Sequence, residues 1–127
     1  MTPRRATLAA MMASLGLAWT LSLASCEGER GVCPAGQHCV CPAESLCLLD
    51  CDGPGCTFEC PPSARCGFQC DDGGCSAVAV QSETCEMGCA GEKCELRCSG
   101  GAYCEMHYCP TCLLECDSES FCRYDKE

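Results

Sequence analysis

The feature that most constrains this chain is a five-residue motif, Cys-x-Φ-x-Cys with an apolar residue at Φ, which returns between Cys41 and Cys122. Its full copies are CLLDC, CTFEC, CGFQC, CEMGC, CELRC and CLLEC, which begin at Cys47, Cys56, Cys66, Cys85, Cys94 and Cys112. Degraded copies begin at Cys75 (CSAVA), Cys104 (CEMHY) and Cys122 (CRYDK). As far as Cys104, the copies start alternately 9 and 10 residues apart, so the chain repeats every 19 residues.

The segments between the copies decide whether the motif is a helix or a strand. On a helix, cysteines at i and i+4 are neighbours on one face. The segments DGPG, PPSAR, DDGG and SGGAY are turn-like and leave about five residues per element, too few for a stable helix. On a strand, positions i, i+2 and i+4 share a face, so both cysteines and Φ point inward. The inward Φ residues are then Leu49, Phe58, Phe68, Ala77, Met87, Leu96, Met106, Leu114 and Tyr124.

Short strands and turns with a period of two motifs predict an all-β, disulfide-rich fold. The specific prediction is a narrow β-solenoid of 19-residue coils with two short strands each. Stacked coils would pair their strands in parallel around a thin interior of sulfur and single apolar side chains. The alternative is a string of disulfide-tied hairpins without continuous stacking. The regular period favours the solenoid, and we assign residues 39–127 to this repeat domain.

Cysteine takes the place of a conventional core. The chain has 20 cysteines among 127 residues, but only three Phe, three Tyr and one Trp. Such a cysteine content is typical of a disulfide scaffold. Scaffolds of this kind use covalent bridges because a small domain with few apolar residues buries too little surface to be stable alone.

Strand geometry limits which cysteines can pair. The two cysteines of one motif lie about 13 Å apart along a strand, whereas a disulfide needs Cα atoms within about 7 Å. Bridges that close the turns between motifs are Cys33–Cys39, Cys41–Cys47, Cys51–Cys56, Cys60–Cys66, Cys70–Cys75, Cys89–Cys94, Cys98–Cys104, Cys109–Cys112 and Cys116–Cys122. Ala79 stands where the repeat expects the partner of Cys85, so Cys85 is predicted to be unpaired. Pairing between successive coils would use the same positions and stays open at this point.

The N-terminus has the layout of an export signal. Residues 1–5 include two arginines, and residues 6–24 carry no charge, as in a secretory leader. Leu23-Ala24-Ser25-Cys26 resembles the lipobox of bacterial lipoproteins. The resemblance implies cleavage before Cys26, acyl chains on its sulfur and new amino group, and stable membrane attachment through those chains. Export would also permit persistent disulfides.

The lipobox resemblance divides the chain into a signal peptide (1–25), a flexible tether with several Gly and Pro (26–38) and the repeat domain. Glu27 follows Cys26, rather than the Asp that tends to retain such lipoproteins at the inner membrane. The resemblance therefore implies the outer membrane, on its periplasmic or surface face. A plain secretory leader and an uncleaved anchor are the alternatives, because nineteen uncharged residues also suffice to span a bilayer.

The charge balance excludes some partners. The formal net charge is −10, with 18 Asp and Glu against 8 Lys and Arg. Nucleic-acid binding needs clustered Lys and Arg, and so does adhesion of a basic patch to anionic lipid. We therefore expect no nucleic-acid partner and no electrostatic membrane contact.

Two cysteine-based chemistries deserve comparison with the repeat. Cys109-Pro110-Thr111-Cys112 has the spacing of a redox centre, but such centres sit at a helix N-terminus that lowers one thiol pKa. The repeat itself explains this segment, with its first cysteine displaced by one position. Clustered thiolates also suit zinc or copper(I). His38 and His107 are the two histidines, and we interpret both as solvated surface residues.

The remaining motifs favour neither catalysis nor a cofactor. The acidic segments Asp50-x-Asp52-Gly53 and Asp71-Asp72-Gly73-Gly74 offer oxygen ligands, but they lack the ligand spacing of a dedicated calcium loop. Asp and Gly equally suit tight turns. No Ser-His-Asp set, catalytic carboxylate pair or phosphate-binding loop can be assembled. The sequence therefore predicts no enzyme, no metal and no cofactor.

Lipobox and repeat together resemble the small cysteine-rich repeat lipoproteins of myxobacteria and related predatory or social bacteria. The resemblance implies a lipid-anchored, disulfide-stapled structural element of the cell envelope. Its acidic outer face would be open to a protein or glycan partner. The alternative from another class is a thiol redox or metal-sequestering lipoprotein.

Overall fold

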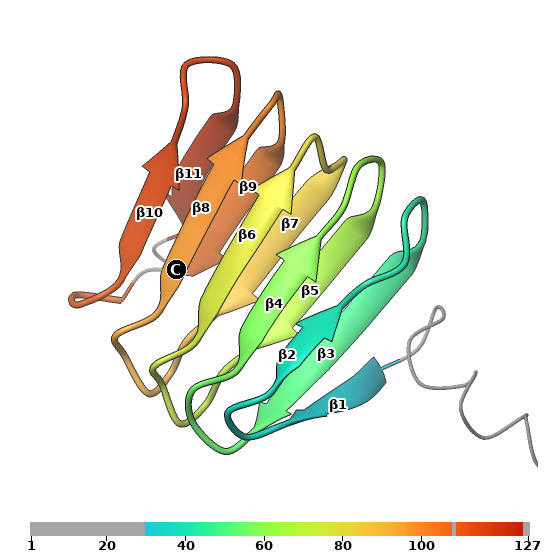
Figure 1. Cartoon of the computed structure of the whole chain (residues 1–127). Helices are drawn as coiled ribbons and strands as arrows, with labels where there is room; N and C mark the ends of the chain where they lie inside the picture. Colours follow the sequence, from blue (N-terminus) through green and yellow to red (C-terminus); the bar gives the residue numbers. More distant parts are fainter. Residues whose placement is uncertain (1–29, 108, 126–127) are drawn as a thin grey trace, which may run out of the picture.

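The computed structural model describes residues 30–107 and 109–125, which form two parallel β-sheets facing each other (Figure 1). Sheet A has the order β1-β3-β5-β7-β9-β11, and sheet B has the order β10-β8-β6-β4-β2. The strands are β1 (Arg30–Pro34), β2 (His38–Val40), β3 (Leu46–Asp52), β4 (Thr57–Cys60), β5 (Arg65–Gln69), β6 (Ser76–Val80), β7 (Thr84–Gly88), β8 (Glu95–Ser99), β9 (Tyr103–His107), β10 (Leu113–Cys116) and β11 (Phe121–Asp125). Because the chain alternates between the sheets, each coil contributes one strand to each.

The strand register reproduces the period of the sequence. In sheet A, Cys47 lies opposite Cys66, Cys66 opposite Cys85, and Cys85 opposite Cys104. These partners are 19 residues apart, and every strand pair is parallel. The predicted β-solenoid is therefore confirmed. The hairpin alternative is wrong, because consecutive strands lie in different sheets and do not pair with each other.

The interior contains the inward cysteines and the Φ residues. The buried Φ residues are Leu49, Phe58, Phe68, Ala77, Met87, Leu96 and Met106. Leu114 and Tyr124 keep the inward register, opposite Leu96 and Met106, but Leu114 is only partly buried and Tyr124 is 40% exposed. They lie on β10 and β11, the last strands of their sheets. No following coil covers these two side chains within the described residues.

Two phenylalanines join the sheets across the interior. Phe58 of β4 and Phe68 of β5 stack with ring centroids 4.3 Å apart and ring planes at 7°. Both rings are almost fully buried, and their strands belong to opposite sheets. Stacked aromatic rings add to the stability that their buried area provides.

The close approach of successive turns explains a glycine in one acidic segment. Gly73 has a φ of 84°, and a Cβ atom there would lie 2.5 Å from the carbonyl oxygen of Gly91 in the next coil. Only glycine accommodates both conditions. Gly53, in the other acidic segment, also has a positive φ of 121°. The geometry of tight turns thus accounts for glycine in both segments.

The repeat begins earlier than the sequence suggested. β1 pairs in parallel with β3, and Gly31 lies opposite Leu49. The prediction of a flexible tether over 26–38 is therefore wrong from residue 30 onward. The motif is hidden there because Gly31 occupies the Φ position and Glu29 stands in place of the first cysteine. The predicted signal peptide and the lipidation site at Cys26 lie outside the described residues.

Replacing Phe58 by Ala should lower the free energy of unfolding by about 3–5 kcal/mol, because it removes a buried ring and leaves a cavity between the sheets. Denaturant unfolding of the protein with intact bridges measures the change. Val78→Ala is the matched control, since Val78 lies on the outer face of neighbouring β6 and is 44% exposed; it should cost less than about 1 kcal/mol. Equal losses in the two variants would contradict this interior.

Candidate functional site

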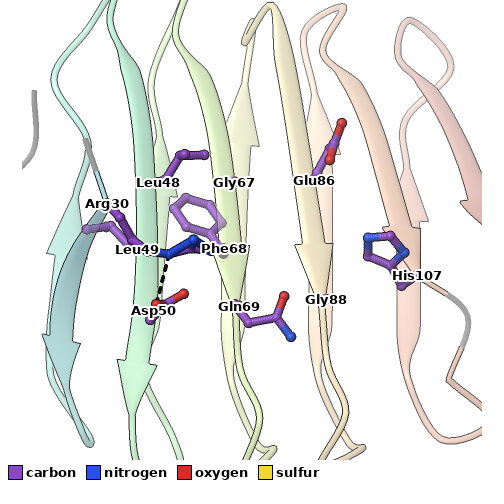
Figure 2. Close-up of a pocket in the computed structure, with 10 residues that line it drawn as sticks. All are labelled: Arg30, Leu48, Leu49, Asp50, Gly67, Phe68, Gln69, Glu86, Gly88 and His107. Carbon is purple, nitrogen blue, oxygen red and sulfur yellow. Dashed lines mark hydrogen bonds and ion pairs between the residues drawn. The ribbon is translucent and has the colours of Figure 1, made fainter. Parts of the chain in front are cut away.

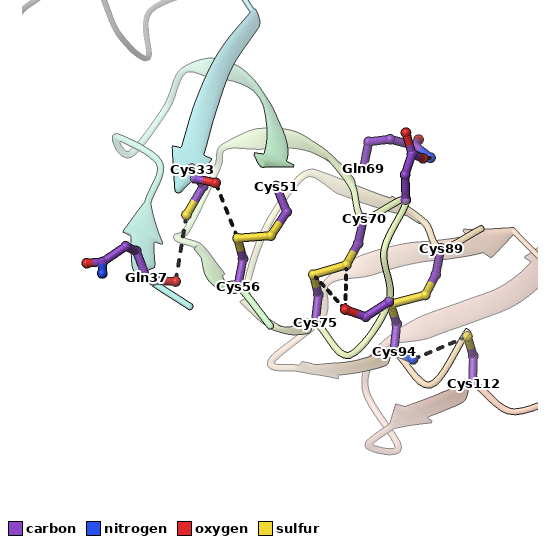
Figure 3. The surroundings of a disulfide bond; sticks show 12 residues. Cys33, Gln37, Cys51, Cys56, Gln69, Cys70, Cys75, Cys89, Cys94 and Cys112 are labelled. Carbon is purple, nitrogen blue, oxygen red and sulfur yellow. Dashed lines mark hydrogen bonds between the residues drawn. A yellow bond between two sulfur atoms is a disulfide. The ribbon is translucent and has the colours of Figure 1, made fainter. Parts of the chain in front are cut away.

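Disulfide bridges form two rows along the solenoid, and part of one row is shown in Figure 3. Ladder I, which closes the turns from sheet A to sheet B, contains Cys33–Cys39, Cys51–Cys56, Cys70–Cys75, Cys89–Cys94 and Cys109–Cys112. Ladder II, which closes the turns from sheet B to sheet A, contains Cys41–Cys47, Cys60–Cys66, Cys98–Cys104 and Cys116–Cys122. These pairs close turns, as the sequence predicted, and none of them joins successive coils in the described part of the chain.

Ladder II lacks its middle bridge. Ala79 lies in register between Cys60 and Cys98, and Cys85 lies between cysteines of the two flanking bridges. Ala79 and Cys85 are both fully buried. Cys85 is the free cysteine of the described residues, as the sequence predicted from Ala79.

A buried hydroxyl holds the turn that has no bridge. Ser82 is 3% exposed, and its Oγ–H donates to the carbonyl oxygen of Cys60 at 2.6 Å. Gln81 of the same turn is bonded to the coils on both sides: the Ser63 N–H donates to the Gln81 carbonyl, and the Gln81 N–H donates to the Ser99 carbonyl. Sequence reasoning missed Ser82. The signal in the sequence was a small polar residue, Ser82, in the turn between Ala79 and Cys85, which has a cysteine at one end only.

Cys85 is chemically inert in the folded protein. Burial raises the pKa of its thiol to about 12, and the nearby Glu86 carboxylate adds to the rise. Thiol–disulfide exchange and metal binding both need the thiolate. Because the thiol keeps its proton at neutral pH and is shielded from solvent, Cys85 serves as a core residue.

Successive bridges of ladder I bring their sulfur atoms close together. The Sγ atoms lie within 4.8 Å of one another in the groups Cys51/Cys70/Cys75, Cys70/Cys89/Cys94 and Cys89/Cys109/Cys112. A fourth group, Cys98/Cys104/Cys122, belongs to ladder II. These groups have the size of a metal site, but each of their sulfurs is in a bridge and has no thiolate charge for zinc or copper(I). The chemistry available to the oxidised ladders is disulfide exchange.

Both histidines lie on the outer surface, as predicted. His38 has Nδ1 2.7 Å from Thr57 Oγ1 and Nε2 2.7 Å from Glu59 Oε2. His107 has Nδ1 3.5 Å from Asp125 Oδ2. More than half of each histidine side chain is exposed. Their partners are polar side chains of the neighbouring coil.

A shallow hollow of about 150 Å³ lies on the outer face of sheet A (Figure 2). The side chain of Gln69 covers Gly88, where a Cβ atom would lie 2.6 Å from the Gln69 amide oxygen. Arg30 and Asp50 form an ion pair of 3.1 Å at one end, while Glu86 and His107 stand apart on β7 and β9. None of the ten lining residues is Ser, Thr, Cys or Lys. The hollow therefore has no hydroxyl, thiol or amine nucleophile.

In comparisons with protein-family models, curated proteins and solved structures, no match to this chain was found. Within residues 30–107 and 109–125, no helix is long and apolar enough to cross a membrane.

Alkaline pH should lower the stability of the protein through Cys85. In the unfolded chain this thiol titrates near its ordinary pKa of 9.0. Between that value and about 12 the folded state binds more protons than the unfolded state, so the free energy of unfolding falls as pH rises. At about pH 10 the loss is on the order of 1 kcal/mol. Cys85→Ala should lack this loss in denaturant unfolding at about pH 8 and about pH 10, and parallel pH dependences of the two proteins would contradict a buried neutral thiol.

Ala79→Cys should complete ladder II. The new thiol would lie in the column of Cys60 and Cys98, both of which are bridged across the same kind of turn. Alkylation in denaturant followed by peptide mapping should label one cysteine among residues 30–125 of the parent protein and none in the variant. The closed loop should stabilise the fold by about 2 kcal/mol. The control Ala79→Cys/Cys85→Ala should keep one thiol and gain nothing; an equal gain there would assign the effect to packing.

Proposed function

We propose that this protein is a lipid-anchored structural element of the bacterial cell envelope, with a surface for a protein or glycan partner. The structural role is supported by one observation, namely that cysteines make up most of the buried core. Eighteen cysteines are joined in nine bridges, most of them buried among the Φ residues. These side chains close the turns and fill much of the interior.

The bridges suit a protein that must persist outside the cytoplasm. Each bridge closes a short loop, with a sequence separation of 3 to 6 residues, and contributes about 2 kcal/mol by restricting the unfolded chain. The parallel sheets then link each coil to the next by backbone hydrogen bonds. A scaffold of this kind resists unfolding although its apolar side chains are few, which supports a structural role in an oxidising compartment.

The outer faces carry charges that are matched between coils. Arg97 of β8 has a nitrogen 3.3 Å from Glu115 of β10 and another 2.6 Å from Glu95 of its own strand, and Arg123 of β11 lies 3.7 Å from Glu105 of β9. Exposed pairs like these contribute at most about 1 kcal/mol each. Their arrangement supports an ordered surface, and the excess of carboxylates in the chain keeps that surface acidic.

An exposed aromatic pair supports the partner-binding part of the proposal. Tyr103 of β9 and Phe121 of β11 stack on the outer face of sheet A with ring centroids 5.1 Å apart. Phe121 is 56% exposed. Aromatic side chains are enriched at binding surfaces, because they offer a large apolar face and, in Tyr, a polar hydroxyl. This pair is a platform for a sugar ring or an apolar side chain of a partner.

Lipid anchoring is tested at Cys26. In a bacterial host that processes lipoproteins, the parent protein should incorporate a labelled fatty acid and fractionate with membranes. Cys26→Ser should lose the label, because the acyl chains attach through the cysteine sulfur and the amino group that cleavage before it exposes.

The matched control is Cys85→Ala, which also removes an unbridged cysteine and should keep both the label and the membrane fraction. Membrane retention of Cys26→Ser without a label would indicate an uncleaved anchor and overturn lipidation. Release of the unlabelled parent protein into the medium would overturn anchoring altogether. The metal-sequestering alternative predicts many alkylatable thiols with bound zinc or copper, in place of the single thiol expected above.

A further inference from the structure

The last bridge of ladder I differs from the others in its loop and in its exposure. Cys109–Cys112 has a sequence separation of 3, whereas the other bridges have separations of 5 or 6. Cys109 is buried, but Cys112 is partly exposed. An incoming thiolate would therefore meet the sulfur of Cys112 first.

Polar groups are placed to stabilise the opened form of this bridge. The backbone N–H of Cys94 donates to Cys112 Sγ at 3.4 Å (Figure 3). The Thr111 hydroxyl lies 3.7 Å from Cys109 Sγ. A hydrogen-bond donor beside a sulfur favours its thiolate over its neutral form. The Thr111 hydroxyl also donates its single proton to Glu92 Oε1 at 3.5 Å, so the fixed donor at this bridge is the Cys94 N–H beside Cys112.

The neighbouring bridge is within reach of the same sulfurs. Cys89, Cys109 and Cys112 have their Sγ atoms within 4.8 Å of one another, and Cys89 is bridged to Cys94. Adjacent strands of a sheet lie about 4.8 Å apart, and a disulfide tolerates Cα separations of about 4.4–6.8 Å. Paired residues of β7 and β9 are 19 apart in the sequence, and Cys109 is 20 after Cys89. A bridge from one coil to the next between them would span one strand spacing plus an offset of one residue, about 6 Å, which is within that range.

We propose that Cys109–Cys112 is a thiol–disulfide exchange site for an incoming dithiol, and that its opening is passed inward to Cys89–Cys94. This activity is independent of lipid anchoring, so either idea can fail without the other. It assigns the Cys-Pro-Thr-Cys segment a role that the repeat alone does not require.

The exchange proceeds in balanced steps. One thiolate of the dithiol attacks Cys112 Sγ, so a mixed disulfide forms, the Cys109–Cys112 bond breaks, and Cys109 leaves as a thiolate. The second thiol of the reductant loses its proton to solvent and attacks the reductant's other sulfur, which is bonded to Cys112 in the mixed disulfide. The reductant departs as a disulfide, having given two electrons, and Cys112 is left as a thiolate beside the Cys94 N–H.

The inward step moves a bond without further oxidation or reduction. The Cys109 thiolate attacks Cys89 Sγ, forming Cys89–Cys109 and breaking Cys89–Cys94, and the electron pair passes to Cys94 Sγ, which takes up a proton. The groups Cys70/Cys89/Cys94 and Cys51/Cys70/Cys75 repeat this arrangement farther along ladder I. Ladder II has no such continuity, because its middle bridge is missing at Ala79.

The terminal bridge of ladder II, Cys116–Cys122, shows whether solvent exposure alone would explain the reactivity expected of Cys109–Cys112. Cys116 is exposed and Cys122 is partly exposed, so exposure alone would open Cys116–Cys122 before Cys109–Cys112. Within the described residues, the hydrogen bonds to cysteine sulfur include the one from Cys94 to Cys112 and none to Cys116 or Cys122.

The first experiment treats the folded, oxidised, processed protein with a limiting amount of dithiothreitol. The reaction is quenched with acid at intervals, free thiols are alkylated with N-ethylmaleimide, and the labelled cysteines are mapped by mass spectrometry. We expect label at Cys112, shared with Cys109 or Cys94, to appear severalfold faster than label at Cys116 and Cys122. Equal or faster labelling of Cys116 and Cys122 would overturn the exchange site.

The second experiment removes one sulfur from each terminal bridge. Cys112→Ser leaves Cys109 as a thiol, and we expect a Cys89–Cys109 crosslinked peptide and an alkylatable Cys94, neither of which the parent contains. The matched control, Cys122→Ser, leaves Cys116, which belongs to none of the three-sulfur groups, and should simply show a free Cys116. An intact Cys89–Cys94 bridge with an alkylatable Cys109 would overturn the inward step. Circular dichroism checks that both variants are folded. If Cys112→Ser is unfolded, the Cys89–Cys109 crosslink is sought in partly reduced parent protein. Its absence there would also overturn the inward step.

Discussion

The structure depends on the enclosure of cysteines and single apolar side chains on the inward faces of its short strands. A strand of five residues buries too little surface to be stable alone, and two facing rows of such strands leave an interior only one side chain deep from each side. Disulfides at the turns overcome this limit, because they fix where each strand ends and the next begins. The parallel ladders then extend the order from coil to coil, and the stacked rings of Phe58 and Phe68 join the sheets at one level.

The departures from the repeat are as informative as the repeat. At Ala79 a bridge is missing, and a buried serine hydroxyl at Ser82 holds the turn through a hydrogen bond to the adjacent coil. The partner thiol at Cys85 is left in the core, where burial keeps it protonated. At the end of ladder I the bridge Cys109–Cys112 closes a shorter loop. Its Cys112 is partly exposed and accepts a hydrogen bond from a backbone N–H. The first departure buries a thiol away from solvent, whereas the second leaves a disulfide partly exposed to a reductant.

Structural and exchange roles are compatible in one molecule. Bridges within the stack are shielded by the coils on either side, so they maintain the scaffold. The last bridge of ladder I has no following coil to shield it among the described residues, which makes it the point of entry for a dithiol. The outer faces, with ion pairs between coils and an exposed aromatic pair, take no part in this chemistry and remain free for a partner.

The sequence by itself determined the period, the strand conformation and the inward set of residues, and it limited the cysteines to two pairing schemes, of which the structure has the turn-closing one. These follow from local constraints, namely the alternation of side chains along a strand and the reach of a disulfide. Only the tertiary structure decided that the coils stack continuously, that the repeat starts by Arg30, that Ser82 substitutes for a bridge, and that Cys94 donates to Cys112. Each of these depends on contacts between residues about 19 positions apart, and the side chains that meet across such a distance are fixed by the stacking and not by the local chain.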